Sequence, residues 1–256
     1  MKYLNFYIFF LLSFSSFSLF AQRQQQIESD LLKPFKNIVD YADKYDLDKS
    51  GEANGLFAKK LKSYCEKIPA TLSYPFRSLV NEHLDISTSS DGQLRIYSWD
   101  TWSGGTMHVF ESMFQYKSGD KMICILDAPT NGDDYTYNYD GLSTFKANNK
   151  VYYLVTYLGI YSTKDVGEGI KVFTIETGKL KGDVKIIKTN SGLHGHLYYD
   201  YDFMSIADMP MEKRPKIIFD ALTKTIKLPL VDANDKVTDK FITYKFTGQY
   251  FERVKN

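Results

Sequence analysis

The sequence predicts an α+β fold made mostly of antiparallel β-structure, with a short helical segment before a larger β domain. Three observations lead to this prediction. Residues 27–84 place apolar side chains at helical spacing, the period changes to two after Gly92, and the turns between the later strand-like runs are short. Short turns are typical of antiparallel neighbours. The β domain could be a sandwich, a barrel or a partial propeller, because periodicity does not distinguish these architectures.

The first 21 residues have the pattern of a secretory signal peptide. Lys2 gives a positive start, residues 6–12 form an apolar run rich in Phe, and serines interrupt the stretch before Ala21. A transmembrane helix needs about 20 consecutive apolar residues, so we expect cleavage after Ala21 and no transmembrane segment in the mature chain. An uncleaved N-terminal anchor is the alternative. The protein is therefore predicted to be exported, to the periplasm or the extracellular space.

The expected organisation has three parts, namely a signal peptide at 1–21, a helical segment at 22–90 and an antiparallel β domain at 91–256. The expected strands are 94–99, 107–117, 121–126, 151–161, 169–176, 184–189, 197–203, 216–219, 225–231 and 241–246. The polar stretch 87–92 marks the expected boundary. The stretch 127–140, rich in Asp, Tyr, Asn and Gly, is expected to be a long loop.

Within the helical segment, Pro34 suits the first turn of a helix, where a proline loses no hydrogen bond. Phe57 and Cys65 share the apolar face of a second helix, with Asp48 or Ser50 expected to cap it. The residues from 46 onward also begin like an EF-hand calcium loop, but Phe57 stands where such a loop needs a bidentate glutamate. Helix capping is therefore the preferred interpretation.

Charge argues against a nucleic-acid partner. After cleavage the chain keeps 31 acidic residues and as many basic ones, one fewer than the 32 of the full sequence because Lys2 is removed. Proteins that bind phosphate backbones concentrate Lys and Arg in a patch or stripe. Neither the balance of charges nor their distribution along this sequence indicates one.

Cys65 and Cys124 are the only cysteines. Disulfides persist in the compartments that exported proteins reach, so one bridge between them is a hypothesis. It would contribute about 4 kcal/mol in the chain-entropy model. The alternative is a pair of buried free thiols, because each cysteine lies in an apolar run.

Four short segments carry a resemblance to a known group of proteins. They are the signal ending LFAQ at 19–22, LRIYSWD at 94–100, GGTMH at 104–108 and YKFTG at 244–248. Together they make the chain similar to uncharacterised secreted proteins of Bacteroidota, a family of unknown function. The resemblance implies export and a β-rich body, and it implies no particular activity or catalytic residue.

The strongest metal-like feature is His194-Gly-His196, because two imidazoles at this spacing on one strand point the same way. Asp200 lies further along the same face. Two histidines and a carboxylate form a known catalytic zinc set with a position open for water. Histidines exposed in an ordinary turn are the alternative interpretation, since Gly192 lies just before the pair and Gly195 lies between the two histidines.

Aromatic residues near the start of the β domain suggest a recognition surface. Tyr97 and Trp99 alternate along the first expected strand, and Trp102 follows in a Trp-Ser-Gly-Gly loop. Exposed rings there could stack on a sugar or contact a partner protein. Packing of Trp99 in the core is the competing interpretation.

The sequence contains no complete catalytic set, so we expect a non-catalytic extracytoplasmic binding or protein-interaction module on a β scaffold. Its expected partner is a protein or a carbohydrate. The alternative is a metal-dependent hydrolase or metal-binding protein that uses His194 and His196. No cofactor is expected apart from a divalent metal ion in that alternative.

Overall fold

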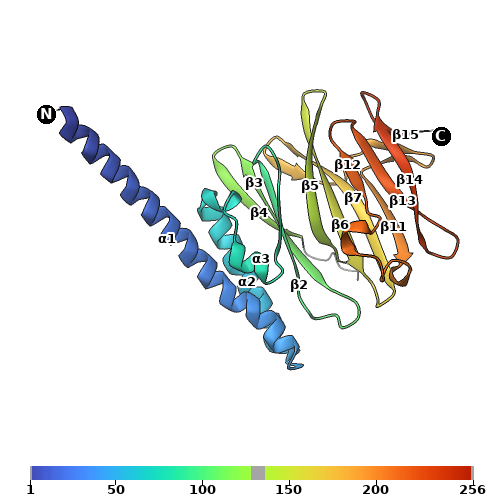
Figure 1. Ribbon diagram of the computed structural model, residues 1–256, viewed down its shortest axis with the longest axis horizontal. Helices are drawn as coiled ribbons and strands as arrows, with labels where there is room; N and C mark the ends of the chain where they lie inside the picture. Colours follow the sequence, from blue (N-terminus) through green and yellow to red (C-terminus); the bar gives the residue numbers. More distant parts are fainter. Residues whose placement is uncertain (1, 128–135, 255–256) are drawn as a thin grey trace.

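The computed structural model describes residues 2–127 and 136–254, and their side chains from residue 22 onward. Helices come first and antiparallel-rich sheets follow (Figure 1), so the predicted α+β fold is confirmed. The helices are α1 (Lys2–Ala42), α2 (Leu47–Lys67) and α3 (Arg77–Asn81). Short 3₁₀ helices lie at Pro69–Leu72, Phe203–Ser205 and Met211–Lys213. In the described part of the chain, no helix combines the length and hydrophobicity needed to cross a membrane.

The strands form open sheets rather than a closed barrel. The four-stranded sheet has the order β1 (Asp85–Thr88), β2 (Leu94–Asp100), β3 (Phe110–Ser118), β4 (Lys121–Asp127). The five-stranded sheet has the order β11 (His196–Asp202), β7 (Asp165–Glu176), β6 (Lys150–Ile160), β5 (Asn138–Ala147), and β8 (Lys179–Lys181) also pairs with β7. The six-stranded sheet has the order β10 (Gly192–His194), β9 (Ile187–Thr189), β15 (Phe251–Arg253), β14 (Val237–Phe246), β13 (Thr225–Val231), β12 (Ile218–Asp220). Of the strand pairs described, β15 with β9 is parallel and the others are antiparallel.

The helices and the three sheets stack as layers, with the five-stranded sheet in the middle of the β-structure (Figure 1). The helices cover one face of the four-stranded sheet, where Trp99 joins their core. The opposite face of that sheet packs on the middle sheet, with Phe114 against Phe173. The far face of the middle sheet packs on the six-stranded sheet. Since successive residues of a strand point to opposite faces, the middle sheet contributes to two separate cores.

Pro34 lies inside α1 and not in the first turn of a helix, so that expectation was wrong. An interior proline removes a backbone hydrogen bond and crowds the preceding turn. Packing offsets this cost, because Leu31, Phe35 and Ile38 around it are buried against α2 and its neighbours. Tertiary contacts of an amphipathic face outweigh intrinsic propensity in helices of this kind.

The second helix was predicted correctly, with Phe57 and Cys65 buried on one face, but its cap was not. Asp46 is the N-cap, and its carboxylate accepts a hydrogen bond from the backbone N–H of Lys49 at 3.3 Å. Ser50 lies inside the helix and donates its hydroxyl to the carbonyl of Ile38 in α1 at 2.8 Å. The polar residue expected as a cap therefore joins the two helices.

Two strands appear where the sequence indicated a boundary and a loop. β1 pairs with β2, so the stretch 87–92 contains the end of a strand and a tight turn. β5 lies in the Asp-, Tyr-, Asn- and Gly-rich region, and its pairing with β6 shifts register between Tyr139 and Gly141. Such a bulge and these turn-forming residues break the period-two pattern that identifies a strand. Residues 128–135 of the expected loop lie outside the described residues.

A carboxylate sits between the middle sheet and the six-stranded sheet. Glu168 accepts hydrogen bonds from the hydroxyls of Tyr199 at 2.8 Å and Tyr201 at 3.0 Å. Burial raises the pKa of Glu168, although these hydrogen bonds oppose the effect. The folded state therefore binds this proton more strongly than the unfolded chain does.

We expect the stability contributed by Glu168 to be complete below its ordinary pKa of 4.5 and to be lost as pH rises through its higher folded-state pKa. A Glu168→Gln variant does not titrate at this position, so its free energy of unfolding should fall less over that range. Urea unfolding from about pH 4 to about pH 8 measures both profiles. Glu212→Gln, at an exposed glutamate, is the control. Parallel profiles for wild type and Glu168→Gln would contradict the assignment.

Candidate functional site

One face of the middle sheet has a row in which a glycine lies between two tyrosines. Tyr198 of β11 pairs with Gly169 of β7, and Gly169 pairs with Tyr157 of β6. A Cβ atom on Gly169 would lie 2.0 Å from Cζ of Tyr157. The Tyr157 ring thus occupies space that any larger residue at position 169 would fill, which is a recurrent reason for glycine within a strand.

The next row along these strands consists of Asp200, Gly167 and Gly159. A Cβ atom on Gly167 would lie 2.6 Å from the hydroxyl of Tyr161 and 2.6 Å from Oδ1 of Asp200. One on Gly159 would lie 2.8 Å from Cε1 of Tyr161. Gly159, Gly167 and Gly169 therefore leave the surface of the sheet free of side chains, and we call this surface the glycine floor. The Tyr161 ring and the Asp200 carboxylate lie over it.

Above this floor is a cleft of about 470 Å³, lined by Tyr137, Tyr157, Tyr161, Gly167, His196, Tyr198 and Asp200. We call it the tyrosine cleft. The rings of Tyr137 and Tyr157 are 4.6 Å apart between centroids and tilted by 54°. Tyr157 is buried, whereas 59% of the Tyr198 surface is exposed. The cleft therefore has a closed inner wall and an open outer one.

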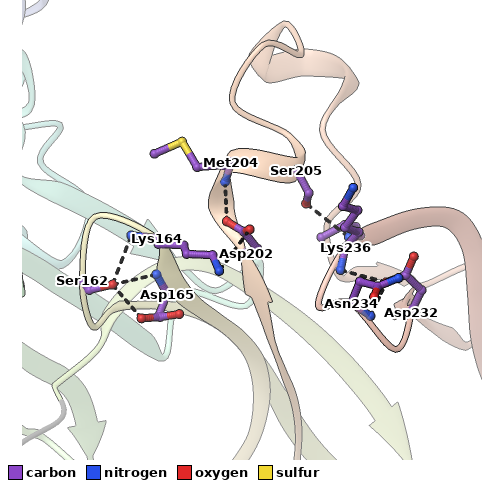
Figure 2. Close-up of polar contacts among 10 residues, drawn as sticks. Ser162, Lys164, Asp165, Asp202, Met204, Ser205, Asp232, Asn234 and Lys236 are labelled. Carbon is purple, nitrogen blue, oxygen red and sulfur yellow. Dashed lines mark hydrogen bonds and ion pairs between the residues drawn. The ribbon is translucent and has the colours of Figure 1, made fainter.

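A hydrogen-bonded turn holds one wall of the cleft in place. The hydroxyl of Ser162 donates to the carboxylate of Asp165 at 2.7 Å and accepts hydrogen bonds from the backbone N–H groups of Lys164 and Asp165 (Figure 2). The backbone N–H of Tyr161 donates to the Asp165 carbonyl at 2.9 Å. Lys164 also reaches the carboxylate of Asp202 at 3.5 Å (Figure 2). These contacts fix the backbone that carries Tyr161.

Of the ionisable groups His196 and Asp200 at the tyrosine cleft, the first has a carboxylate partner among the described residues and the second has none. Nδ1 of His196 lies 2.6 Å from the carboxylate of Asp183, and this hydrogen bond lowers the pKa of Asp183. Lys171 extends away over the ring of Phe173, with its Nζ 5.7 Å from the centroid. Asp200, in contrast, is exposed at the edge of the cleft and has no hydrogen-bond or ion-pair partner within residues 22–127 and 136–254. Partial desolvation raises its pKa.

The structure does not bring the proposed metal ligands together. β10, with His194, belongs to the six-stranded sheet, while β11, with His196 and Asp200, belongs to the middle sheet. His194 contacts the hydroxyl of Ser191 at 2.9 Å. His196 and Asp200 are four residues apart along one strand, about 13 Å. No group of three or more His, Cys, Asp and Glu side chains with metal-site geometry occurs in the described part of the chain.

Two of the three aromatic residues expected at a surface are buried. Trp99 is 1% exposed and packs under the helices, and Tyr97 donates its hydroxyl to Gln115 at 2.8 Å in the same core. The core-packing interpretation therefore holds for Trp99. Trp102 is 44% exposed, and its backbone N–H donates to the carboxylate of Asp100 at 2.8 Å. It borders two small clefts, of about 360 and 250 Å³, between the 101–109 loop and the end of α1.

Cys65 and Cys124 are both buried free thiols. Cys65 and burial together raise the pKa of Cys124. Cys65 also lies 3.5 Å from the hydroxyl of Tyr97. The disulfide therefore stays a prediction. The two cysteines lie in the same core cluster, where α2 packs on β4.

We expect glutathione disulfide to join Cys65 and Cys124, with the two protein thiols oxidised and the reagent reduced to two glutathione thiols. Peptide mapping under non-reducing conditions should yield the linked pair of peptides, and the oxidised protein should gain up to about 4 kcal/mol in free energy of unfolding. A Cys124→Ser variant should show neither change. Two thiols that are both alkylated on unfolding after this treatment would contradict the prediction.

Another cleft, of about 590 Å³, lies at the opposite ends of the same strands. Charged residues of hairpin turns line it, and three of them have polar partners within it. Lys150 contacts Glu176 at 3.0 Å, and Tyr153 donates its hydroxyl to Asp91 at 3.0 Å. Since these polar groups already have partners, the tyrosine cleft with its unpaired carboxylate is the better candidate site.

Comparison with protein-family models, with curated proteins and with solved structures finds no match to this chain. The candidate site therefore stands on its own geometry. Sequence reasoning considered His196 and Asp200 as metal ligands. It missed the tyrosines and glycines contributed by the other strands, which are Tyr137, Tyr157, Tyr161, Gly167 and Gly169. The signal was present in Gly167-Glu-Gly169, since two glycines on one face of a strand indicate close approach by another group.

Proposed function

We propose that this chain is an exported, non-catalytic binding protein whose ligand occupies the tyrosine cleft. The observation that carries the proposal is the convergence of tyrosine side chains over a glycine floor beside an unpaired carboxylate. Binding sites are usually concave and mostly aromatic or apolar, with a few polar groups that orient the ligand. Tyrosine suits this role because it offers a large rigid contact surface and a hydroxyl at low entropic cost.

Preorganisation supports binding at this position. Tyr157 is packed over Gly169 and the turn at Ser162 holds Tyr161, so these rings need little reordering when a ligand enters. A site that is rigid before binding loses less entropy on association. Tyr198 at the open edge is exposed, so its side chain has room to close over a ligand.

Export is part of the proposal and rests on the first 21 residues and on the resemblance to secreted Bacteroidota proteins. The alternative of a metal-dependent hydrolase has weaker support. His194 and His196 lie in different sheets, and Nδ1 of His196 is held by Asp183. The geometry thus favours a structural role for this histidine at the rim of the cleft.

A ligand screen tests the proposal. The purified protein is mixed with small sugars, amino acids, carboxylic acids and amines, and binding is detected by saturation-transfer NMR. We expect at least one class to bind, and Tyr198→Ala to abolish its signal without lowering the melting temperature, because Tyr198 is exposed. Trp102→Ala serves as the matched control at another exposed aromatic. Loss of binding in Trp102→Ala with full binding in Tyr198→Ala would overturn the assignment of the site.

A further inference from the structure

We infer that the ligand of the tyrosine cleft is a small organic cation, an alkylammonium or quaternary ammonium group held by the tyrosine rings and by Asp200. This inference rests on the proposed function and names the chemistry of the same site. It follows from the ring arrangement, from the charge balance of the cleft and from the space available.

Four of the tyrosine side chains that the structure describes line the cleft. Tyr137 and Tyr157 are tilted by 54° to one another, and Tyr161 and Tyr198 line the same cleft from a turn and from a neighbouring strand. The Tyr137 and Tyr157 rings contact one another, and their tilt leaves no flat platform of the kind on which a sugar ring stacks. The face of an aromatic ring carries negative potential, so a ring face that borders the cleft attracts a cation.

The ionisable side chains on one face of β11 differ in whether they have a partner of opposite charge. Within the described residues, His196 is matched by Asp183 and Asp202 is matched by Lys164. Asp200, between them on the same face, has no such partner. Lys171 on the adjacent strand is turned toward Phe173. Among the described residues that line the cleft there is no Lys or Arg. The Asp200 carboxylate can therefore pair with a positively charged ligand.

Anions and bare metal ions fit the residues of this cleft less well than an organic cation does. A phosphate or carboxylate would be repelled by the Asp200 carboxylate, with no lining Lys or Arg among the described residues to offset the repulsion. A bare divalent metal would find one carboxylate where it needs several oxygen ligands. An organic cation fits both features, because its alkyl surface contacts the rings while its charge is balanced by Asp200. A cleft of about 470 Å³ suits a molecule of this size.

The test compares choline with 3,3-dimethyl-1-butanol, which has the same shape without the charge. Isothermal titration of the full chain should show choline binding at least about tenfold more tightly, the advantage of a charge among aromatic faces and near a carboxylate. Butylamine tests the primary ammonium in the same way. Methyl glucoside represents the neutral sugars. Pelleting with phosphatidylcholine vesicles distinguishes a lipid headgroup from a free cation as the source.

Variants make the test specific. Asp200→Asn should weaken choline binding about tenfold, Tyr198→Ala should abolish it, and Tyr198→Phe, which keeps the ring, should retain it. Asp239→Asn, at an exposed carboxylate on β14, is the charge-matched control and should bind as wild type does. Thermal unfolding of each variant confirms that the fold is kept.

The outcomes separate this inference from the proposed function. If the neutral isostere or the sugar binds as tightly as choline, and Tyr198→Ala abolishes that binding, the cleft is a binding site and the cation inference is overturned. The same conclusion follows if Asp200→Asn binds choline unchanged. If none of the probes, nor any compound of the wider screen, binds in a manner that depends on Tyr198, both proposals fail.

Discussion

Replacing Trp99 with alanine should lower the free energy of unfolding by about 3–5 kcal/mol, the cost of removing a large buried aromatic side chain from a packed core. Trp99 is 1% exposed and meets Phe57 of α2 edge-on, with 5.1 Å between ring centroids. Its indole N–H donates to the side-chain oxygen of Asn54 at 2.8 Å. The variant therefore creates a cavity and leaves a partly buried acceptor without its donor, which adds to the loss.

Trp102→Ala is the matched control for this experiment. Trp102 is 44% exposed and should change the free energy of unfolding by no more than about 0.5 kcal/mol. Urea unfolding followed by far-ultraviolet circular dichroism suits both variants, because it does not depend on tryptophan fluorescence. Equal effects of the two substitutions would contradict the packing of the helical layer on the four-stranded sheet.

Gly195→Ala should destabilise the protein by about 1–3 kcal/mol or more, the range for forcing extra volume into a packed interior. A Cβ atom at this position would lie 2.1 Å from the carbonyl carbon and 2.3 Å from the carbonyl oxygen of Asp183. These are backbone atoms, so no side chain can rotate away. The Gly195 carbonyl also accepts the backbone N–H of Val172 at 2.7 Å, which ties this glycine to β7.

Gly55→Ala provides a control of opposite sign. Gly55 lies in α2 with nothing within 4 Å of an added Cβ, so alanine there should stabilise the helix by about 0.5–1 kcal/mol. Denaturant midpoints measure both changes. Moving the Asp183 backbone should also separate Asp183 from His196, and the histidine ring resonances in NMR would report it. A stable Gly195→Ala protein with an intact Asp183 to His196 contact would contradict the close approach.

The sequence predicts only part of the candidate site. The alternation along residues 196–200 correctly places His196, Tyr198 and Asp200 on one face of β11. Tyr157 and Tyr161 come from a different hairpin, and pairing of β11 with β7 brings them close. The Gly167-Glu-Gly169 pattern indicates that something approaches the strand, but it does not say which side chain does so.

For His194, the local sequence pattern led to a wrong prediction of its strand. Two residues apart on one continuous strand, His194 and His196 would point the same way. The chain instead passes from the six-stranded sheet to the middle sheet at Gly195, where the Asp183 backbone comes close. Local spacing carries no information about such a change of sheet, because it depends on contacts between residues distant in sequence.

By itself the sequence determined the α+β class, the α2 helix and most of the strands, because hydrophobic periodicity and turn chemistry act over a few neighbouring residues. The order of the sheets, the burial of Trp99 and the assembly of the tyrosine cleft were decided by the tertiary structure. Each of these depends on which strands pair and which faces are covered. Those choices follow from packing between distant segments, where a glycine on one strand makes room for a tyrosine on another.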